Sequence, residues 1–338
     1  MSKGKKLIVN IGFIIAFILT LALGGVVCAK EVGEKLVFKW ANSYTEGHLR
    51  TKVWKDYSAR VLKVTDGQIE FKMFSGQSLV KAREEYEAVV TGAIDISIGN
   101  SADITGYQSW VHFVAIPGVY RSFDYLMEIL KMGRPIIERE FDKSGLKLLW
   151  LHPCTICNLY SRKGFVKTMD DFKGLKGRIP GGFTSESFII WGGATVSLSS
   201  AEQYTALQRG TVDCTYTGTD SYVGFKLYEV APYVTKFQHP YGGNFIIMNN
   251  KAWNKIPGHH QKKILDVGRE FMDIMPQITI DEQDALYKEM VANGAKLYNP
   301  NPELKKSMED VLKPLWERYI KVAGDTGKEI YRIIYSRP

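Results

Sequence analysis

Cysteine and histidine are scarce in this sequence, which contains 4 cysteines and 6 histidines among its 338 residues. The histidines are scattered, and the adjacent pair His259 and His260 would point about 100° apart on a helix. Such a pair could not share a metal ion as two histidines four residues apart would. We therefore expect no metal site, and no motif in the sequence indicates a cofactor.

Long runs of one charge and low-complexity tracts are also absent. Lysine and arginine outnumber aspartate and glutamate by 44 to 36, which gives a formal charge of +8. The basic residues do not form a stripe interleaved with aromatic residues, as a nucleic-acid-binding surface would. We expect no nucleic-acid partner, and we interpret the positive excess as solvated surface.

Motifs for catalysis are missing too. There is no nucleophile elbow, no pair of carboxylates at a distinctive spacing and no phosphate-binding glycine loop. Cys154 and Cys157 have the spacing of a redox dithiol, but such a motif usually begins a helix after a strand, and this stretch is expected to stay extended. Together with Cys214 they allow one disulfide, whose pairing the sequence leaves open.

The N-terminus has the features of a secretory signal. Lysines precede an uncharged apolar run at residues 7–27, and the tripeptide VCA at residues 27–29 fits a signal-peptidase site. We predict a signal peptide over residues 1–29, cleaved after Ala29, and an exported, periplasmic mature protein. A retained membrane anchor or a lipid-modified Cys28 is the alternative, although the valine before that cysteine disfavours lipidation.

The remaining sequence indicates an α/β protein. Residues 36–44 and 69–73 have the apolar pattern of strands, and apolar residues recur at helical spacing between them, over residues 49–61. This order is the βαβ signature of a mainly parallel sheet. Further along we expect a helix at 123–132, a strand at 147–151, either one long helix or two abutting helices over 259–293 with an interruption at Pro276, and a final helix at 303–323.

Two segments of the chain resemble each other. EEYEAVVTGAIDISIGNS from Glu84 and EQYTALQRGTVDCTYTGT from Glu202 align without a gap. Each predicts a helix that ends at a glycine, Gly92 or Gly210, followed by a buried strand; Ser199 with Glu202 also has the spacing of a capping box. One such unit per domain predicts two α/β domains whose strand ends face each other across a ligand cleft.

Arg178 is the strongest candidate for contact with a ligand. It ends a strand-like run and is followed by Pro180, Gly181 and Gly182, so the backbone beyond it is open. An arginine binds a carboxylate through two parallel hydrogen bonds, and glycines let a ligand approach the backbone. A solvated strand-end arginine is the alternative that the local sequence leaves open. Asn100, in the polar loop after the first repeat strand, is a second candidate, with a turn-stabilising role as its alternative.

Four ordered motifs carry a family resemblance. KGLKGRIPGG, SSAEQYTALQRGTVD, GQSLVKAREEYEAVVTGAIDISIGN and NNKAWNKIPGHHQKKI together resemble solute receptors of tripartite ATP-independent periplasmic (TRAP) transporters, dicarboxylate-receptor type. The resemblance covers nearly all of the chain after the leader. It implies a two-domain, periplasmic-binding-protein-like α/β clamshell with a long helix that spans both domains.

The resemblance also implies the function and the domain limits. Such a receptor captures an organic acid anion in the interdomain cleft and delivers it to membrane permease subunits, and we expect it to be a monomer. We expect domain I to comprise residues 30–153 plus 243–281, and domain II residues 154–242 plus 282–338. The rival hypotheses are a secreted α/β thiol oxidoreductase that uses Cys154 and Cys157, or a binding protein of an ABC importer or a sensor.

Residue roles follow from the same resemblance. The arginine of the family motif KGLKxRVP holds the substrate carboxylate, which places that role on Arg178. A second arginine of sugar-acid receptors would fall near Ile156, and a polar contact, often Asn, falls at Thr217, so we favour a monocarboxylate with an apolar or aromatic body. The candidate substrate-binding residues are Arg178, Asn100, Thr217, Tyr216, Asn244, Asn42, Trp40 and Tyr44, with Phe183 also near the cleft. The aromatic residues among them could equally belong to the core.

Overall fold

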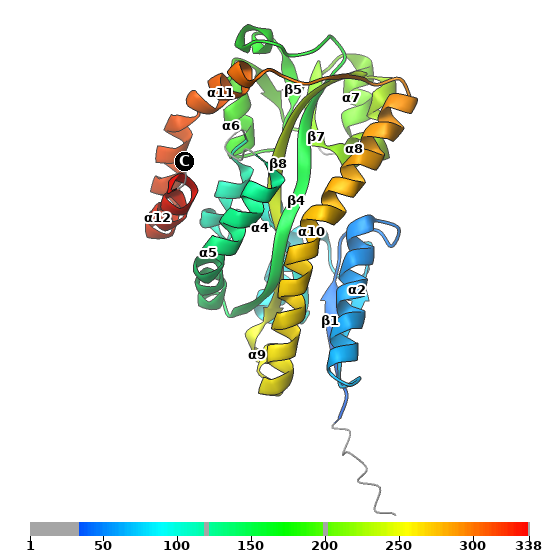
Figure 1. Cartoon of the computed structure of the whole chain (residues 1–338), viewed down its shortest axis with the longest axis vertical. Coiled ribbons are helices and arrows are strands. Elements are labelled where there is room, and N and C mark those ends of the chain that lie inside the picture. Colours follow the sequence, from blue (N-terminus) through cyan, green and yellow to red (C-terminus); the bar gives the residue numbers. More distant parts are fainter. Residues whose placement is uncertain (1–33, 118–121, 199–201, 337–338) are drawn as a thin grey trace, which may run out of the picture.

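The computed structural model describes residues 34–117, 122–198 and 202–336 (Figure 1). The predicted signal peptide with its cleavage site and the predicted capping box at Ser199 lie outside these residues. The described helices are α2 (Leu49–Val64), α3 (Glu85–Thr91), α4 (Ser101–Ile104), α5 (Phe123–Lys143), α6 (Phe183–Ile190), α7 (Gln203–Arg209), α8 (Thr219–Gly224), α9 (Asn250–Trp253), α10 (Gly258–Ala292), α11 (Pro302–Asp310) and α12 (Lys313–Tyr335), with 3-10 turns η1 (Ala82–Glu84), η2 (Ser109–Ala115), η3 (Met169–Phe172) and η5 (Leu227–Glu229).

The described strands form one continuous sheet in the order β2-β1-β3-β8-β4-β7-β5-β6, with β9 paired to β8. Their bounds are β1 (Leu36–Ala41), β2 (Ile69–Phe74), β3 (Ile96–Asn100), β4 (Leu146–Ser161), β5 (Lys176–Arg178), β6 (Ala194–Val196), β7 (Cys214–Gly218), β8 (Tyr233–Asn249) and β9 (Lys296–Tyr298). Strands β1, β2 and β3 are parallel to one another, as are β5, β6 and β7. We call the part of the sheet around β1, β2 and β3 the first lobe, and the part around β5, β6 and β7 the second lobe.

The two lobes repeat the same local structure, as the sequence repeat predicts. Helices α3 and α7 both end at a glycine in the left-handed conformation, with φ of 82° at Gly92 and 73° at Gly210. In each lobe a strand hydroxyl donates a hydrogen bond to the buried second residue of the repeat: Ser97 to Glu85 at 3.3 Å, and Thr215 to Gln203 at 2.6 Å.

A second element of the repeat ties neighbouring strands together. The carboxylate of Asp95 accepts a hydrogen bond from the backbone N–H of Lys39 in β1, at 2.7 Å. The carboxylate of Asp213 accepts one from the backbone N–H of Lys176 in β5, at 3.1 Å. The repeated aspartate, which directly precedes β3 in one lobe and β7 in the other, therefore makes the equivalent contact to a neighbouring strand in each lobe.

Three long elements connect the lobes. The antiparallel strands β4 and β8 run through both of them, and Pro153 of β4 lies opposite Gly243 of β8 where the strands pass from one lobe to the other. Helix α10 packs along β4 and contacts both α2 of the first lobe and α8 of the second (Figure 1). The predicted crossings near residues 153 and 242 thus lie side by side, while the domain limits themselves stay a prediction.

Some helix limits differ from those predicted. Helix α5 continues to Lys143 rather than ending at residue 132, and it includes Pro135, because its buried face extends to Ile137 and Phe141 beyond the proline. Helix α10 is one continuous helix that includes Pro276, rather than two abutting helices. The final helix is divided into α11 and α12, and α12 extends to Tyr335 across a kink at Gly324.

None of the helices in the described part of the chain is long and apolar enough to cross a membrane.

Candidate functional site

A cavity of about 830 Å³ lies between the two lobes. The first lobe contributes residues from α4 and η2, among them Ser101, Asp103 and His112. The second lobe contributes the end of β5, the glycines after it and the segment before α7. Tyr241 of β8 lies where that strand crosses between lobes. A ligand in this cavity would therefore contact both lobes.

Arg178 is a buried cation in the cavity wall. It is the last residue of β5, which is held between β6 and β7, and it is 8% exposed. Its Nε donates a hydrogen bond to the Leu198 carbonyl at 3.1 Å, which fixes the plane of the guanidinium. Burial lowers the pKa of Arg178 from its ordinary value, opposed by Tyr241 and Cys157. A guanidinium nevertheless stays charged at neutral pH.

The backbone beside Arg178 is open to the cavity. Gly181 and Gly182 are exposed and line it, and Gly182 has a φ of 67°, a left-handed conformation that disfavours residues with a Cβ. A planar anion could therefore approach the guanidinium without meeting side chains at these two positions. This geometry suits a carboxylate.

The opposite wall comes from the first lobe. The His112 ring lies 4.9 Å from the Phe183 ring of α6, and Thr184 of α6 donates a hydrogen bond to the Ala115 carbonyl at 2.8 Å. Burial, and then the charge of Arg318, lowers the pKa of His112, so the imidazole is neutral at neutral pH. The wall thus offers a hydrogen-bonding group without a charge.

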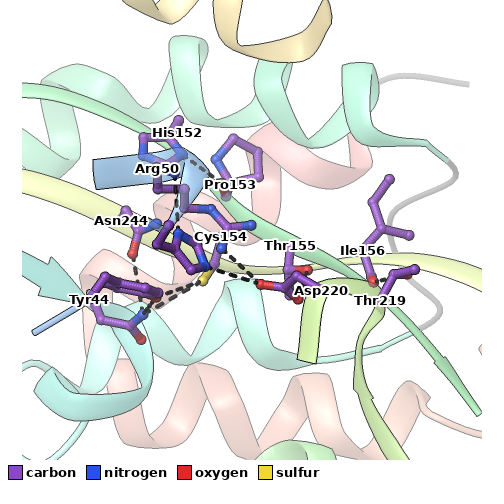
Figure 2. Close-up of polar contacts among 12 residues, drawn as sticks. Tyr44, Arg50, His152, Pro153, Cys154, Thr155, Ile156, Thr219, Asp220 and Asn244 are labelled. Atoms are coloured by element: carbon purple, nitrogen blue, oxygen red, sulfur yellow. Dashed lines mark hydrogen bonds and ion pairs between the residues drawn. The ribbon is translucent and has the colours of Figure 1, made fainter. Parts of the chain in front are cut away.

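Three of the predicted residues, Tyr44, Asn100 and Asn244, meet where β4 and β8 cross between the lobes. We call these three and Cys154 the crossing cluster; Tyr44, Cys154 and Asn244 are labelled in Figure 2. Asn100 Nδ2 donates to the Tyr44 hydroxyl and to Asn244 Oδ1, each at 3.2 Å. Cys154 Sγ lies 3.6 Å from Asn100 Nδ2 and 3.8 Å from the Tyr44 hydroxyl. Asn100 also accepts from the Ala102 backbone and so begins α4, which is the turn role left open as its alternative.

The crossing cluster adjoins the cavity through one residue. Ser101 follows Asn100 and lines the cavity, and its hydroxyl accepts a hydrogen bond from the Gly243 backbone at 3.0 Å. Tyr44, Asn100 and Asn244 therefore lie behind the cavity wall at Ser101 and do not line the cavity themselves.

The other predicted residues lie in the interior. Trp40 is fully buried in the core, with its ring 6.1 Å from Tyr57 and 6.4 Å from Phe71. Asn42 is buried and donates to the Thr51 and Ser75 hydroxyls. For the aromatic residue Trp40, the structure thus shows the core placement that the sequence left open.

Tyr216 and Thr217 are buried in β7. The Tyr216 hydroxyl hydrogen bonds to His239 Nδ1 at 3.0 Å, and Thr217 lies opposite Asn158 of β4. Phe183 is buried at the start of α6, beside His112.

The sequence did not point to Tyr241, His112 and Ser101 as cavity residues. Ser101 directly follows the candidate Asn100, and Tyr241 directly precedes the two glycines at the crossing. Both could therefore have been predicted from their neighbours in the sequence. His112 lies in an apolar run and carried no such signal.

The cysteines give no support to redox or metal chemistry. Cys154, Cys157 and Cys214 are unpaired, and burial raises the pKa of each thiol. The segment that contains Cys154 and Cys157 is extended, as predicted, rather than the start of a helix. Within residues 34–117, 122–198 and 202–336, no three His, Cys, Asp or Glu side chains are grouped as metal ligands.

Comparison with known proteins gives consistent matches over most of the chain. The family profile described as "Bacterial extracellular solute-binding protein, family 7" matches residues 40–322. The C4-dicarboxylate-binding periplasmic protein DctP of Rhodobacter capsulatus is 23% identical over 311 residues, which cover 90% of this chain and 92% of that protein.

Solved structures share the fold. A TRAP periplasmic solute-binding protein from Ochrobactrum anthropi superposes with a TM-score of 0.84 at 21% identity, covering 90% of this chain and 96% of that one. Another from Desulfovibrio salexigens, with bound orotic acid, has a TM-score of 0.79 at 24% identity, covering 89% and 98%. This similarity confirms the predicted two-domain α/β class.

Proposed function

Because the chain belongs to family 7 of the bacterial extracellular solute-binding proteins, the receptors of TRAP transporters, we propose that it captures an organic acid whose carboxylate is held by Arg178. Proteins of this family are transporter receptors and not enzymes, so the thiol oxidoreductase and ABC-type alternatives are set aside.

The observation that carries the proposal is the position of Arg178. Its guanidinium is 8% exposed and lies in the wall of a cavity between the two lobes, where a charge pair is screened less than at the surface. A carboxylate bound there would form charge-assisted hydrogen bonds with it, which are about twice as strong as neutral ones. The exposed glycines beside Arg178 leave room for the carboxylate to reach the guanidinium.

The charges around the cavity favour one carboxylate rather than two. Asp103 and Glu202 also line the cavity, and a second carboxylate near either would be repelled. Arg83, the other arginine of the lining, is exposed, so its charge is screened by water. Ala115, Ile179 and Leu198 supply apolar surface. These features support a monocarboxylate with an apolar or aromatic body.

Binding would act by closing the lobes. A ligand shifts an open–closed equilibrium only through its higher affinity for one state, and contacts to both lobes at once exist only in the closed state. The closed receptor would then deliver the anion to the membrane permease subunits. We also propose that the receptor works as an exported, periplasmic monomer whose leader is cleaved after Ala29.

A ligand screen tests the proposal. Thermal unfolding would be followed with orotate, benzoate, phenylacetate, pyroglutamate, succinate, malate and glucuronate, together with the carboxamide of each acid that stabilises the protein. A ligand at 100 times its Kd stabilises the folded state by about 2.7 kcal/mol, so a true ligand gives a clear shift. We expect a monocarboxylate to raise the Tm and its carboxamide to have no effect. Equal shifts from acid and amide, or no shift from any organic acid, would contradict the proposal.

A further inference from the structure

A second arginine, Arg50, is buried at the junction of the lobes (Figure 2). It lies in the first turn of α2, in the first lobe, and is 4% exposed. Its Nη1 lies 3.2 Å from Oδ2 of Asp220, which belongs to α8 in the second lobe. The two residues are 170 positions apart in the sequence. This ion pair therefore joins the lobes directly.

Polar side chains from both lobes surround the ion pair of Arg50 and Asp220. Thr155 of β4 donates a hydrogen bond to Asp220 Oδ1 at 3.1 Å, so the second lobe holds that carboxylate in place. His48 Nε2, from the first lobe, lies 3.8 Å from Asp220 Oδ2. Glu282 of α10 is half-buried nearby, and its charge acts on Arg50 as well.

The carboxylate stays ionised in this setting. Burial alone would raise the pKa of Asp220, but its contact with His48 and the charge of Arg50 hold the pKa well below its ordinary value. Arg50 is charged at any physiological pH. The contact is therefore an ion pair at neutral pH.

The strength of this pair depends on how far apart the lobes are. When the lobes are in contact, each charge has lost its water and is compensated by the other, so neither can be removed alone without leaving a buried charge. When they separate, both charges regain water, and at separations beyond about 10 Å salt screens their attraction. The pair thus contributes to the closed form and not to the open form.

We propose that Arg50 and Asp220 form a latch that stabilises the closed form of the receptor and thereby sets its affinity for ligand. The latch rests on the receptor function of the fold but not on the assignment of Arg178. It makes Arg50 and Asp220 positioning residues: they act by holding the lobes together, and neither is part of the cavity lining.

The effect on affinity follows from the population of the closed form. The apparent Kd equals the intrinsic Kd divided by the fraction of receptor that is competent to bind. Coupling between two such sites is typically worth 5- to 150-fold, so loss of the latch is expected to weaken binding by about tenfold.

The test needs no ligand, so a wrong assignment of the carboxylate site would not affect it. Small-angle scattering would give the radius of gyration of the ligand-free wild type and of Asp220→Asn, Arg50→Gln and Arg50→Lys. We expect both neutral variants to be more expanded than the wild type. Arg50→Lys, which keeps the charge, should retain most of the compaction. The double variant Arg50→Gln/Asp220→Asn should expand no further than either single one, because both remove the same interaction.

A matched control is available within the second lobe. The Asp213 side chain is 12% exposed, against 16% for Asp220, and it pairs with Lys163 at 2.8 Å without bridging the lobes. Asp213→Asn should lower the Tm without changing the radius. Equal radii for the wild type and Asp220→Asn, or an equal expansion of Asp213→Asn, would overturn the latch. Melting curves of every variant would establish that each is folded.

Discussion

Glu85 is a buried carboxyl whose ionisation should make the stability of the receptor fall as pH rises. It is 2% exposed and accepts a hydrogen bond from Ser97 at 3.3 Å. Burial raises the pKa of Glu85 from 4.5 to about 8, and hydrogen bonds from Ser43 and Ser97 lower it only in part. Between these two values the folded state binds more protons at this site than the unfolded state does, so stability decreases with rising pH.

The pKa shift sets an upper limit on the free energy of unfolding that is lost when Glu85 ionises. Each pKa unit corresponds to about 1.4 kcal/mol, so full ionisation of the folded carboxyl would cost at most about 5 kcal/mol, and relaxation of the site reduces this to about 2 kcal/mol. Glu85→Gln removes the charge at a position where the second lobe already has Gln203, hydrogen bonded to Thr215 in the same way. We therefore expect the variant to match the wild type near pH 4.5 and to exceed its unfolding free energy by about 2 kcal/mol at pH 8.5.

Urea unfolding at a series of pH values would measure this difference. Glu87→Gln is the control, because Glu87 is exposed on the same helix, and it should follow the wild type at every pH. If Glu85→Gln and the wild type lose stability with pH at the same rate, Glu85 is not the group responsible, and the argument from its burial is wrong.

Three further predictions concern the site and its surroundings. A ligand found by the thermal screen should reduce the radius of gyration of the receptor, because it contacts both lobes, and an unchanged radius would exclude hinge closure. Replacing both Cys154 and Cys157 by serine should leave ligand affinity within a few fold in calorimetry, because neither thiol lines the cavity; loss of binding in a folded double variant would return the cysteines to the site. Trp40→Phe should lower the free energy of unfolding by about 1 to 3 kcal/mol, since it leaves a void in the core, but should leave the Kd unchanged; a weakened Kd at unchanged stability would place Trp40 at the ligand.

Much of the fold follows from local patterns in the sequence. The repeat was visible because the same residues recur at the helix end, at the strand and at the aspartate that ties neighbouring strands together, and Gly92 and Gly210 take the left-handed conformation that their positions require. Arg178 was a candidate because it ends a strand-like run before two glycines and matches the arginine of the family motif, and the structure places it in the cavity wall. These features are marked by short patterns of residues that are local in the sequence.

The remaining features depend on how distant segments pack. Aromatic residues have the same pattern in a core as in a cleft, so nothing in the sequence distinguished Trp40 from Tyr44. The contact between Arg50 and Asp220 exists only when the lobes meet, and neither residue belongs to a recognisable motif. The length of α12 was missed because the glycine at position 324, which usually ends a helix, here produces a kink and the helix resumes beyond it.

Calorimetry of ligand binding to Arg178 variants tests the central claim most directly. With the acid selected by the screen, Arg178→Ala should cost about 3 kcal/mol, on the order of a hundredfold in Kd, since charged hydrogen bonds are lost from a buried site. Arg178→Lys should recover only part of this loss, because a point charge cannot form the two parallel bonds of a guanidinium. Arg83→Ala, at an exposed arginine of the same cavity, should change the Kd by less than about fivefold. A Kd that is unchanged in a folded Arg178→Ala variant would contradict the assignment of the carboxylate to this residue.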